Sequence, residues 1–238
     1  MEKNFSVENT AEPSSQPRRI EVLSTFVADP VIETLRYWCD RFQFSTEFLP
    51  FDYGQLFPRL LKRDNRLDSA DFHVVLFAIR DLIPEKERQN ISAGIPHANI
   101  TEFLKALDLG IKESRGAWIL ICCPDPPTET LNGAVGLSEQ AVFVANGAKR
   151  LEKVAYIDAS DSRTIHSNGL YFDEITDKHG HIPYIESFYA VIGTLVFRTI
   201  RERLGNVYKL IITDCDGTLW DGVCGEVEPS RLLVLPHH

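Results

Sequence analysis

The chain has 238 residues, of which 44% are hydrophobic and 25% charged, a composition typical of globular proteins that excludes disorder throughout. Its formal net charge of -9 at pH 7, with no basic stripe along the sequence, argues against nucleic acid as a partner. No apolar run approaches the roughly 20 residues of a membrane span, and the N-terminus lacks the apolar core of a secretion signal, so we expect a cytoplasmic protein without a membrane partner.

Cysteine usage supports the same location. The five cysteines are odd in number, two are adjacent, and no pair has C-x-x-C spacing; they are Cys39, Cys122, Cys123, Cys215 and Cys224. This pattern indicates neither a disulfide framework nor a zinc ribbon. A reducing compartment fits it best.

The first 19 residues are polar and include two Pro and two Ser residues between positions 13 and 17. We therefore predict a disordered leader over 1–19. From Ile20 onward, short apolar runs alternate with longer amphipathic stretches, which is typical of repeated βα units. The predicted strands are Ile20–Ser24, Thr46–Phe51, His73–Ile79, Trp118–Cys123, Val154–Ile157 and Lys209–Thr213. The predicted helices are Pro30–Arg41, Tyr53–Leu61, Ile100–Lys112, Leu137–Leu151 and Tyr184–Leu204.

Most of these strands are continuously apolar, as expected for strands buried on both faces of a parallel sheet. We therefore predict an α/β fold, with a doubly wound, mostly parallel sheet in three layers over residues 20–205. Residues 206–238 would contribute the first strand and loop of a second α/β domain. The stretch Asp158–His179 is the least periodic and is predicted to be a long loop, rich in Asp, Ser, His and Gly.

An acidic motif follows the last predicted strand. Asp214-Cys215-Asp216-Gly217-Thr218 begins where the apolar run ends, at the edge of the sheet where ligands bind in α/β folds. A carboxylate there can attack a phosphoryl group, and a second carboxylate two residues later can transfer the leaving-group proton. Two carboxylates so close favour a divalent cation with oxygen ligands, most plausibly Mg²⁺. The motif therefore predicts phosphoryl chemistry at Asp214 and Asp216.

Two simpler interpretations compete. A calcium loop of the EF-hand type needs Asp or Asn at its fifth position and Gly at its sixth, where this chain has Thr218 and Leu219, so that interpretation fails on spacing. An acidic turn without chemistry is the other alternative, and it does not explain why strand, motif and following aromatic occur together.

The stretch Leu210–Glu226 resembles the first motif of the FkbH-like proteins, which belong to subfamily IIIC of the haloacid dehalogenase superfamily. Gly217 stands where that family commonly has Asn. The resemblance extends to Leu23–Pro30 and to Gly180–Tyr184, so it spans nearly all of residues 20–238. Similar proteins remove phosphate from a phosphorylated glycerate, a three-carbon acid, and transfer the glyceryl or acyl unit to an acyl carrier protein in polyketide-type biosynthesis.

By this resemblance, Asp214 and Asp216 would be the nucleophile and the acid/base, and both would bind Mg²⁺. Cys215 or Cys224 could carry the acyl group as a thioester, although each could equally be a small buried side chain. Motifs that follow the first one in the superfamily are missing from the 238 residues. We therefore expect a C-terminally truncated, incomplete domain that is inactive alone, whether the truncation is natural or not.

The N-terminal domains of similar proteins look like SGNH hydrolases. In those enzymes the nucleophilic Ser follows the first strand, and an Asp/His pair precedes the last helix. Ser24, His181 and Asp177 fall at these places and could form a relay in which His181 accepts the serine proton. Val22 and Leu23 stand where those enzymes have Gly-Asp, and no clear G-x-N-D stretch is present. For this reason an ester or acyl hydrolase is an alternative to the main prediction.

A non-catalytic module that docks a carrier protein is the other alternative. Basic residues are candidates for contact with an acidic carrier, although such clusters are more often solvated surface; they are Arg18, Arg19, Lys62, Arg63 and Arg66. Arg80 and Asp81, at the end of the third predicted strand, could also contribute to a ligand pocket, or form a simple surface contact.

Overall fold

The computed structural model describes residues 16–49, 54–61, 69–92, 94–127, 134–160, 170–205, 220–221 and 233–234. Its contacts divide the chain into two compact units, residues 1–203 and residues 204–238. The predicted domain boundary at 205 lies close to this division. In the part of the chain that the structure describes, no helix is long and apolar enough to cross a membrane.

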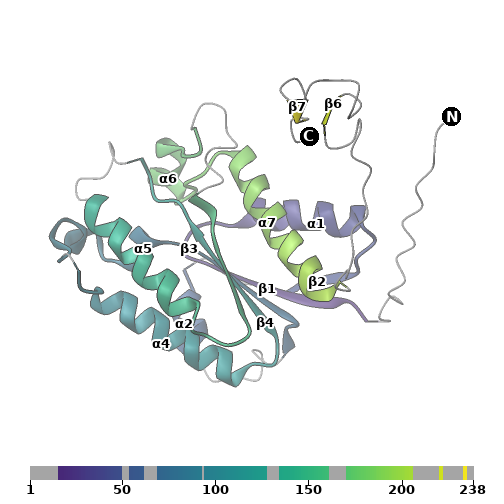
Figure 1. The fold of residues 1–238 in the computed structure, drawn as a ribbon, viewed down its shortest axis with the longest axis horizontal. Coiled ribbons are helices and arrows are strands. Elements are labelled where there is room, and N and C mark those ends of the chain that lie inside the picture. Colours follow the sequence, from purple (N-terminus) through teal and green to yellow (C-terminus); the bar gives the residue numbers. More distant parts are fainter. Residues whose placement is uncertain are drawn as a thin grey trace. The chain divides into compact units, whose positions relative to one another are not determined.

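The first unit contains a five-stranded sheet in which each pair of neighbouring strands is parallel (Figure 1). Along the sheet the strands follow the order β2-β1-β3-β4-β5. Their bounds are Arg18–Ser24 for β1, Thr46–Leu49 for β2, Phe72–Ala78 for β3, Ala117–Cys123 for β4 and Val154–Asp158 for β5. This is the order of a doubly wound sheet of the flavodoxin type. The predicted fold class is confirmed for this unit.

Helices cover both faces of the sheet. The helices are α1 (Asp29–Arg41), α2 (Leu56–Leu61), α3 (Ile79–Leu82), α4 (Ala98–Glu113), α5 (Ala134–Ala148), α6 (Glu174–Gly180) and α7 (Glu186–Leu204), with a 3-10 helix, η2, at Glu85–Asn90. One hydrophobic core joins α1 and α7 to the sheet, through residues such as Leu35 and Ile192. The other core joins α2, α4 and α5 to the opposite face, through residues such as Leu60 and Phe103.

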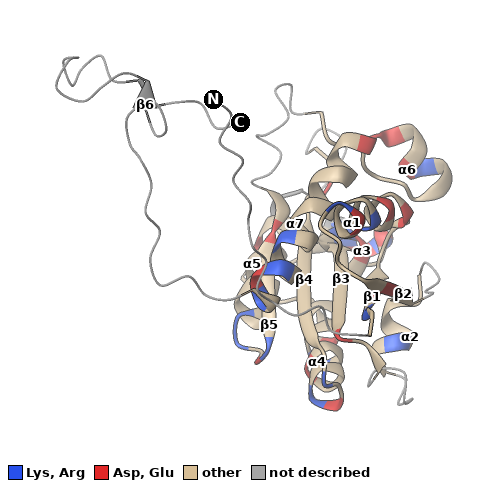
Figure 2. Ribbon diagram, turned by 90° about the vertical axis from the view of Figure 1, so that its right-hand side faces the viewer, with Lys and Arg blue, Asp and Glu red and all other residues tan. Residues whose placement is uncertain are grey.

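The strands explain why the sheet is sandwiched between helices. Every residue of β3 is buried, and β4 is buried from Trp118 onward. Figure 2 shows the central strands almost free of charged residues, while the charges lie mainly on the helices and loops. Because an uninterrupted apolar strand must be covered on both faces, the sequence requires two helical layers.

The helices differ from the sequence prediction in two places. The predicted loop Asp158–His179 contains α6, which the periodicity did not reveal because none of its side chains is buried. The Asp173 carboxylate caps this helix by accepting hydrogen bonds from the N–H groups of Ile175 and Thr176. The helix α4 begins at Ala98, earlier than predicted, and His97 Nδ1 caps it by accepting from Asn99 N–H.

In the second unit the structure describes one antiparallel pair, β6 (Trp220–Asp221) with β7 (Leu233–Val234). The predicted strand Lys209–Thr213 lies outside the described residues, as does most of the predicted leader.

One charged group of three side chains is buried within the first unit, and we call Glu21, Arg59 and His73 the buried cluster. Glu21 Oε1 accepts a hydrogen bond from Arg59 Nε at 2.6 Å, and Glu21 Oε2 lies 2.7 Å from His73 Nδ1. Burial alone would raise the pKa of Glu21, but the contacts with His73 and Arg59 outweigh it, and the pKa is lowered. Glu21 is therefore the ionised partner of Arg59.

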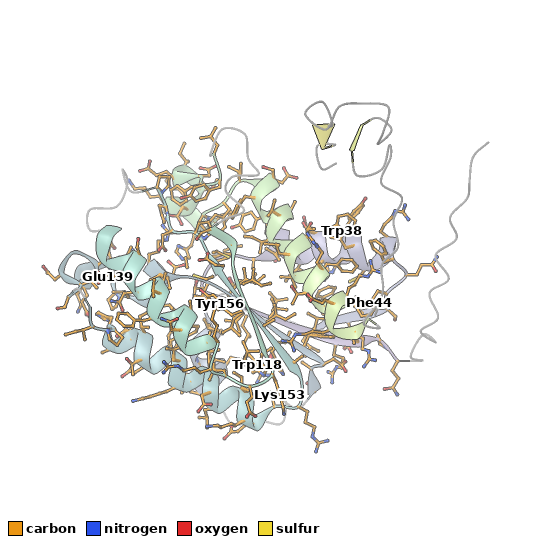
Figure 3. All side chains as sticks on the ribbon, in the orientation of Figure 1. Trp38, Phe44, Trp118, Glu139, Lys153 and Tyr156 are labelled. Carbon is orange, nitrogen blue, oxygen red and sulfur yellow. The ribbon has the colours of Figure 1, made fainter. Side chains whose placement is uncertain are left out.

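The buried cluster lies near the amino ends of the strands, because His73 contacts Trp118, the second residue of β4. The imidazole of His73 stacks on the Trp118 ring with centroids 4.5 Å apart. Figure 3 shows Trp118 near Lys153, the residue before β5, and the Lys153 carbonyl oxygen accepts the Trp118 N–H. A different set of polar side chains lies at the carboxyl ends of the strands.

Candidate functional site

Polar side chains gather at the carboxyl ends of the strands. In the order β2-β1-β3-β4-β5, the direction of winding reverses between β1 and β3, and ligands bind at such switch points in α/β proteins. Thr25 directly follows β1, and Arg80 and Asp81 follow β3. We call the polar group at this edge the edge cluster; it comprises Thr25, Arg80, Asp81, Asp125, Asp177 and His181.

Thr25 and Asp81 connect the ends of β1 and β3. The Thr25 hydroxyl donates to Asp81 Oδ2 at 3.0 Å and accepts from the Ala78 N–H at 3.3 Å. The other oxygen of the same carboxylate, Asp81 Oδ1, lies 3.3 Å from His181 Nε2. Asp81 therefore stands between the hydroxyl and the imidazole.

Arg80 is a buried cation at the centre of the edge cluster, with a residue exposure of 7%. Its guanidinium binds Asp177 with two hydrogen bonds, from Nη1 at 2.8 Å and from Nη2 at 2.6 Å. Arg80 Nε lies 3.4 Å from Asp81 Oδ1, and the guanidinium carbon lies 5.5 Å from the centre of the Phe172 ring. Burial would lower the pKa of Arg80, but the bond to Asp177 and the charge of Asp81 raise it. The residue is a permanent cation.

His181 ends α6 in the left-handed backbone region, with φ of 52°. Its Nδ1 lies 3.5 Å from Asp177 Oδ1, one helical turn earlier. The hydrogen bond to Asp81 raises the pKa of His181 above its ordinary value, against the opposing effect of burial. The contact with Asp81 therefore extends the pH range over which the imidazole stays protonated.

Asp125 joins the edge cluster from the end of β4. Its Oδ1 accepts the Arg80 backbone N–H at 2.9 Å, and its carbonyl oxygen accepts the Tyr171 hydroxyl at 2.7 Å. Burial raises the pKa of Asp125 to about 6, with the nearby charge of Asp81 adding to the shift. This carboxyl group titrates close to neutral pH, which is a property of many functional sites.

The structure brings together two of the three residues of the predicted relay, Asp177 and His181. Ser24, at the end of β1, is only 5% exposed, and its Oγ accepts a hydrogen bond from the Phe26 N–H at 3.2 Å. Within the described residues the Ser24 hydroxyl makes no hydrogen bond to His181. The relay with Ser24 therefore stays a prediction. The hydroxyl that contacts Asp81, the carboxylate partner of His181, belongs to Thr25.

The residues of the predicted phosphate site are Asp214, Cys215 and Asp216, and all three lie outside the described residues, as does Cys224. Their predicted roles therefore stay predictions. The described cysteines, Cys39, Cys122 and Cys123, are buried, and burial raises the pKa of each thiol. A thiol with a raised pKa is a poor nucleophile.

Sequence reasoning missed Thr25 and Asp125 as members of the edge cluster. Thr25 directly follows one predicted strand, and Asp125 comes two residues after another. The carboxyl ends of parallel strands meet at one edge, so these positions were a usable signal. Arg80 and Asp81 were named as pocket candidates, but their burial could not be read from the sequence. Among the residues that the structure describes, no group of three or more His, Cys, Asp or Glu side chains could hold a metal ion.

No protein-family model matches the chain, and no curated protein matches its sequence. Among solved structures, the chain is similar to the crystal structure of the N-terminal part of the protein BF1531 from Bacteroides fragilis, which contains a phosphatase domain complexed with Mg. The TM-score is 0.71 and the sequence identity is 14%. The match covers 91% of this chain but 60% of that chain. At this identity the likeness shows a shared α/β fold.

Proposed function

We propose that this chain belongs to a Mg²⁺-dependent phosphate-removing protein of the FkbH-like type, with Asp214 and Asp216 as its reacting carboxylates. The observation that carries the proposal is the motif Asp214–Thr218 directly after the apolar run Tyr208–Thr213. Carboxylate oxygens are the ligands that Mg²⁺ prefers, so the donor set fits the ion.

The likeness to the BF1531 fragment supports the proposal. The match covers 91% of this chain, and the matched structure contains a phosphatase domain complexed with Mg. The chain spans only 60% of that structure, and the activity of the whole protein is therefore part of the proposal.

In the proposed reaction, the Asp214 carboxylate attacks the phosphorus of a phosphate ester, and the ester oxygen leaves with a proton from Asp216. Water then attacks the aspartyl phosphate, Asp216 takes a proton from that water, and inorganic phosphate departs. A bound Mg²⁺ would offset the repulsion between the two carboxylates and the phosphate. We propose a phosphorylated three-carbon acid as the substrate and an acyl carrier protein as the acceptor. Transfer would use a phosphate bound to the carboxyl group of that acid: a thiolate, of Cys215 or of the carrier, attacks the acyl carbon and that phosphate leaves.

The test uses Mn²⁺ as a spectroscopic probe for the cation site of the full 238-residue chain, by electron paramagnetic resonance. Asp214→Asn and Asp216→Asn should each weaken Mn²⁺ binding by about tenfold or more, since losing even a hydrogen bond that orients a metal ligand costs that much. Asp221→Asn is the matched control because it removes an equal charge nearby, and it should leave binding unchanged. Equal binding by all three variants would contradict the proposal.

A second candidate function has one observation in its favour, which is the contact between Asp177 and His181. It is the ester or acyl hydrolase, with Ser24 as the nucleophile. A fluorophosphonate probe tests it directly, because covalent labelling should disappear in Ser24→Ala and persist in Thr25→Ala. Labelling that survives Ser24→Ala would remove Ser24 from consideration, and loss in Thr25→Ala alone would assign the nucleophile to Thr25.

A further inference from the structure

Residues 173–183, which include α6, form a loop of the first unit whose two ends meet at one point. Phe172 and Tyr184 form an isolated antiparallel bridge, and the Asp173 N–H donates to the Pro183 carbonyl oxygen at 2.9 Å. Just outside, the Ile185 N–H donates to the Tyr171 carbonyl oxygen at 3.1 Å. We call residues 173–183 the α6 loop. Its two ends are fixed side by side, so the loop can move about them as a unit.

The flanks of the α6 loop are anchored, but its helix is not. Tyr171 and Tyr184 are buried, and the Tyr184 hydroxyl donates to the Pro124 carbonyl oxygen at 2.9 Å. In contrast, α6 buries none of its side chains, and Ile175 is 71% exposed. Figure 2 shows acidic and basic residues together on this helix. Hydrophobic burial therefore contributes little at the helix itself. Within the loop it is found at the C-terminal end, where Ile182 packs against the core and Pro183 is buried next to the bridge.

Polar contacts hold the helix instead. Asp177 binds the Arg80 guanidinium twice, His181 reaches Asp81, and the His181 carbonyl oxygen accepts the Val27 N–H at 3.1 Å. Arg80 and Asp81 both follow β3, at the switch point of the sheet. The α6 loop is thus attached over the place where ligands bind in this class of fold.

We propose that the α6 loop is a lid over the switch point, which pivots at the Phe172–Tyr184 bridge and is held closed by the ion pairs Arg80–Asp177 and Asp81–His181. Opening the lid uncovers Thr25, Asp81 and Arg80 while the sheet stays folded. Segments held by few buried contacts open at low free-energy cost, without global unfolding. The inference is independent of the phosphate motif and of the proposed function.

The lid should also respond to pH through His181. The charged groups that face the imidazole are Asp81 and Arg80 from α3 and Asp177 from α6. Because the Asp81 contact raises the folded-state pKa of His181, the Asp81–His181 attraction is fully present below the ordinary histidine pKa and is lost as pH rises through the raised value. The lid is therefore held less firmly in alkaline solution.

Amide hydrogen exchange on the full chain tests the lid. Asp177→Asn should speed exchange of the α6 amides by about ten- to a hundredfold, because hydrogen bonds to charged groups contribute roughly 1.5–3 kcal/mol. Amides of β3 and α4 should keep their wild-type rates. Glu174→Gln is the matched control, since it removes the same charge from the same helix, and no ion pair of Glu174 is present among the described residues. It should leave α6 exchange unchanged.

A second measurement keeps the test decisive if Asp177→Asn unfolds the whole unit. In the wild type, α6 protection factors should fall between about pH 6 and about pH 8 relative to those of α4, the range in which histidine loses its proton. In His181→Asn, which tolerates the left-handed backbone, that change should disappear. Equal exchange in Asp177→Asn and Glu174→Gln would overturn the proposal. So would wild-type α6 amides that exchange only when β3 does.

Discussion

The buried cluster and the edge cluster both contain an arginine, a histidine and at least one carboxylate, yet their surroundings differ. Glu21, Arg59 and His73 lie between β1, β3 and α2, with exposures of 2%, 8% and 0%. The edge cluster lies at the opposite ends of the same strands, and its histidine, His181, is 29% exposed at the side chain. One cluster is covered by a hydrophobic core, whereas the other draws Asp177 and His181 from a short helix without buried side chains and from its C-cap.

The comparison separates a structural role from a functional one. In the buried cluster, one carboxylate contacts two partners, and His73 Nε2 has no hydrogen-bond partner among the residues that the structure describes. In the edge cluster, carboxylates outnumber the cations, and Asp125 titrates near pH 6. Groups that can change charge or exchange partners without unfolding the protein are suited to binding and chemistry. Groups sealed in the core can change only with the fold itself.

The largest expected effect follows from breaking the buried cluster. Glu21→Gln removes the negative charge that Arg59 and His73 share among the described residues, and breaking a buried ion pair from one side costs about 3–5 kcal/mol. Urea unfolding monitored by tryptophan fluorescence measures the loss. Glu47→Gln is the control, because its pair with Arg19 is exposed and such pairs contribute about 0–1 kcal/mol. Similar losses in the two variants would contradict the distinction between the clusters.

A smaller effect is expected at Gly116, which precedes β4. A Cβ atom there would lie 2.5 Å from the Ala70 carbonyl oxygen and 2.9 Å from His73 Cδ2, so the backbone or the buried imidazole must move. Gly116→Ala should destabilise the protein by about 1–3 kcal/mol, the usual cost of overpacking. Gly180→Ala, whose Cβ would meet nothing closer than 3.4 Å, should stay within about 1 kcal/mol of the wild type in the same urea experiment. A neutral Gly116→Ala would show that the imidazole is free to move.

The sequence predicted the sheet better than the edge cluster. Mostly apolar runs predicted β1, β3 and β4, and the structure confirms all three, because burial on both faces leaves a local signature. The short helix α6 leaves none, since it has no buried face. Contacts such as Arg80–Asp177 join residues 97 positions apart, and no local pattern encodes such a pair. The backbone turn after β1 also decides whether Ser24 or Thr25 faces Asp81, and strand prediction stops short of that turn.

A further expected effect on stability concerns the pH dependence that Asp125 contributes. Its pKa is raised from 3.8 to about 6 by burial, so the folded state binds a proton more tightly than the unfolded state does. The stability from this carboxyl group is fully present below pH 3.8 and is lost as pH rises through about 6. Asp125→Asn imitates the protonated form, and its amide oxygen can still accept the Arg80 N–H. The variant should therefore gain stability relative to the wild type as pH rises from about 4 to about 7 and hold a constant advantage above that, as measured by urea midpoints at each pH. A difference that does not vary with pH would mean that the Asp125 carboxyl group is solvated in the folded state. The edge cluster would then lose the titrating group that most distinguishes it from the buried cluster.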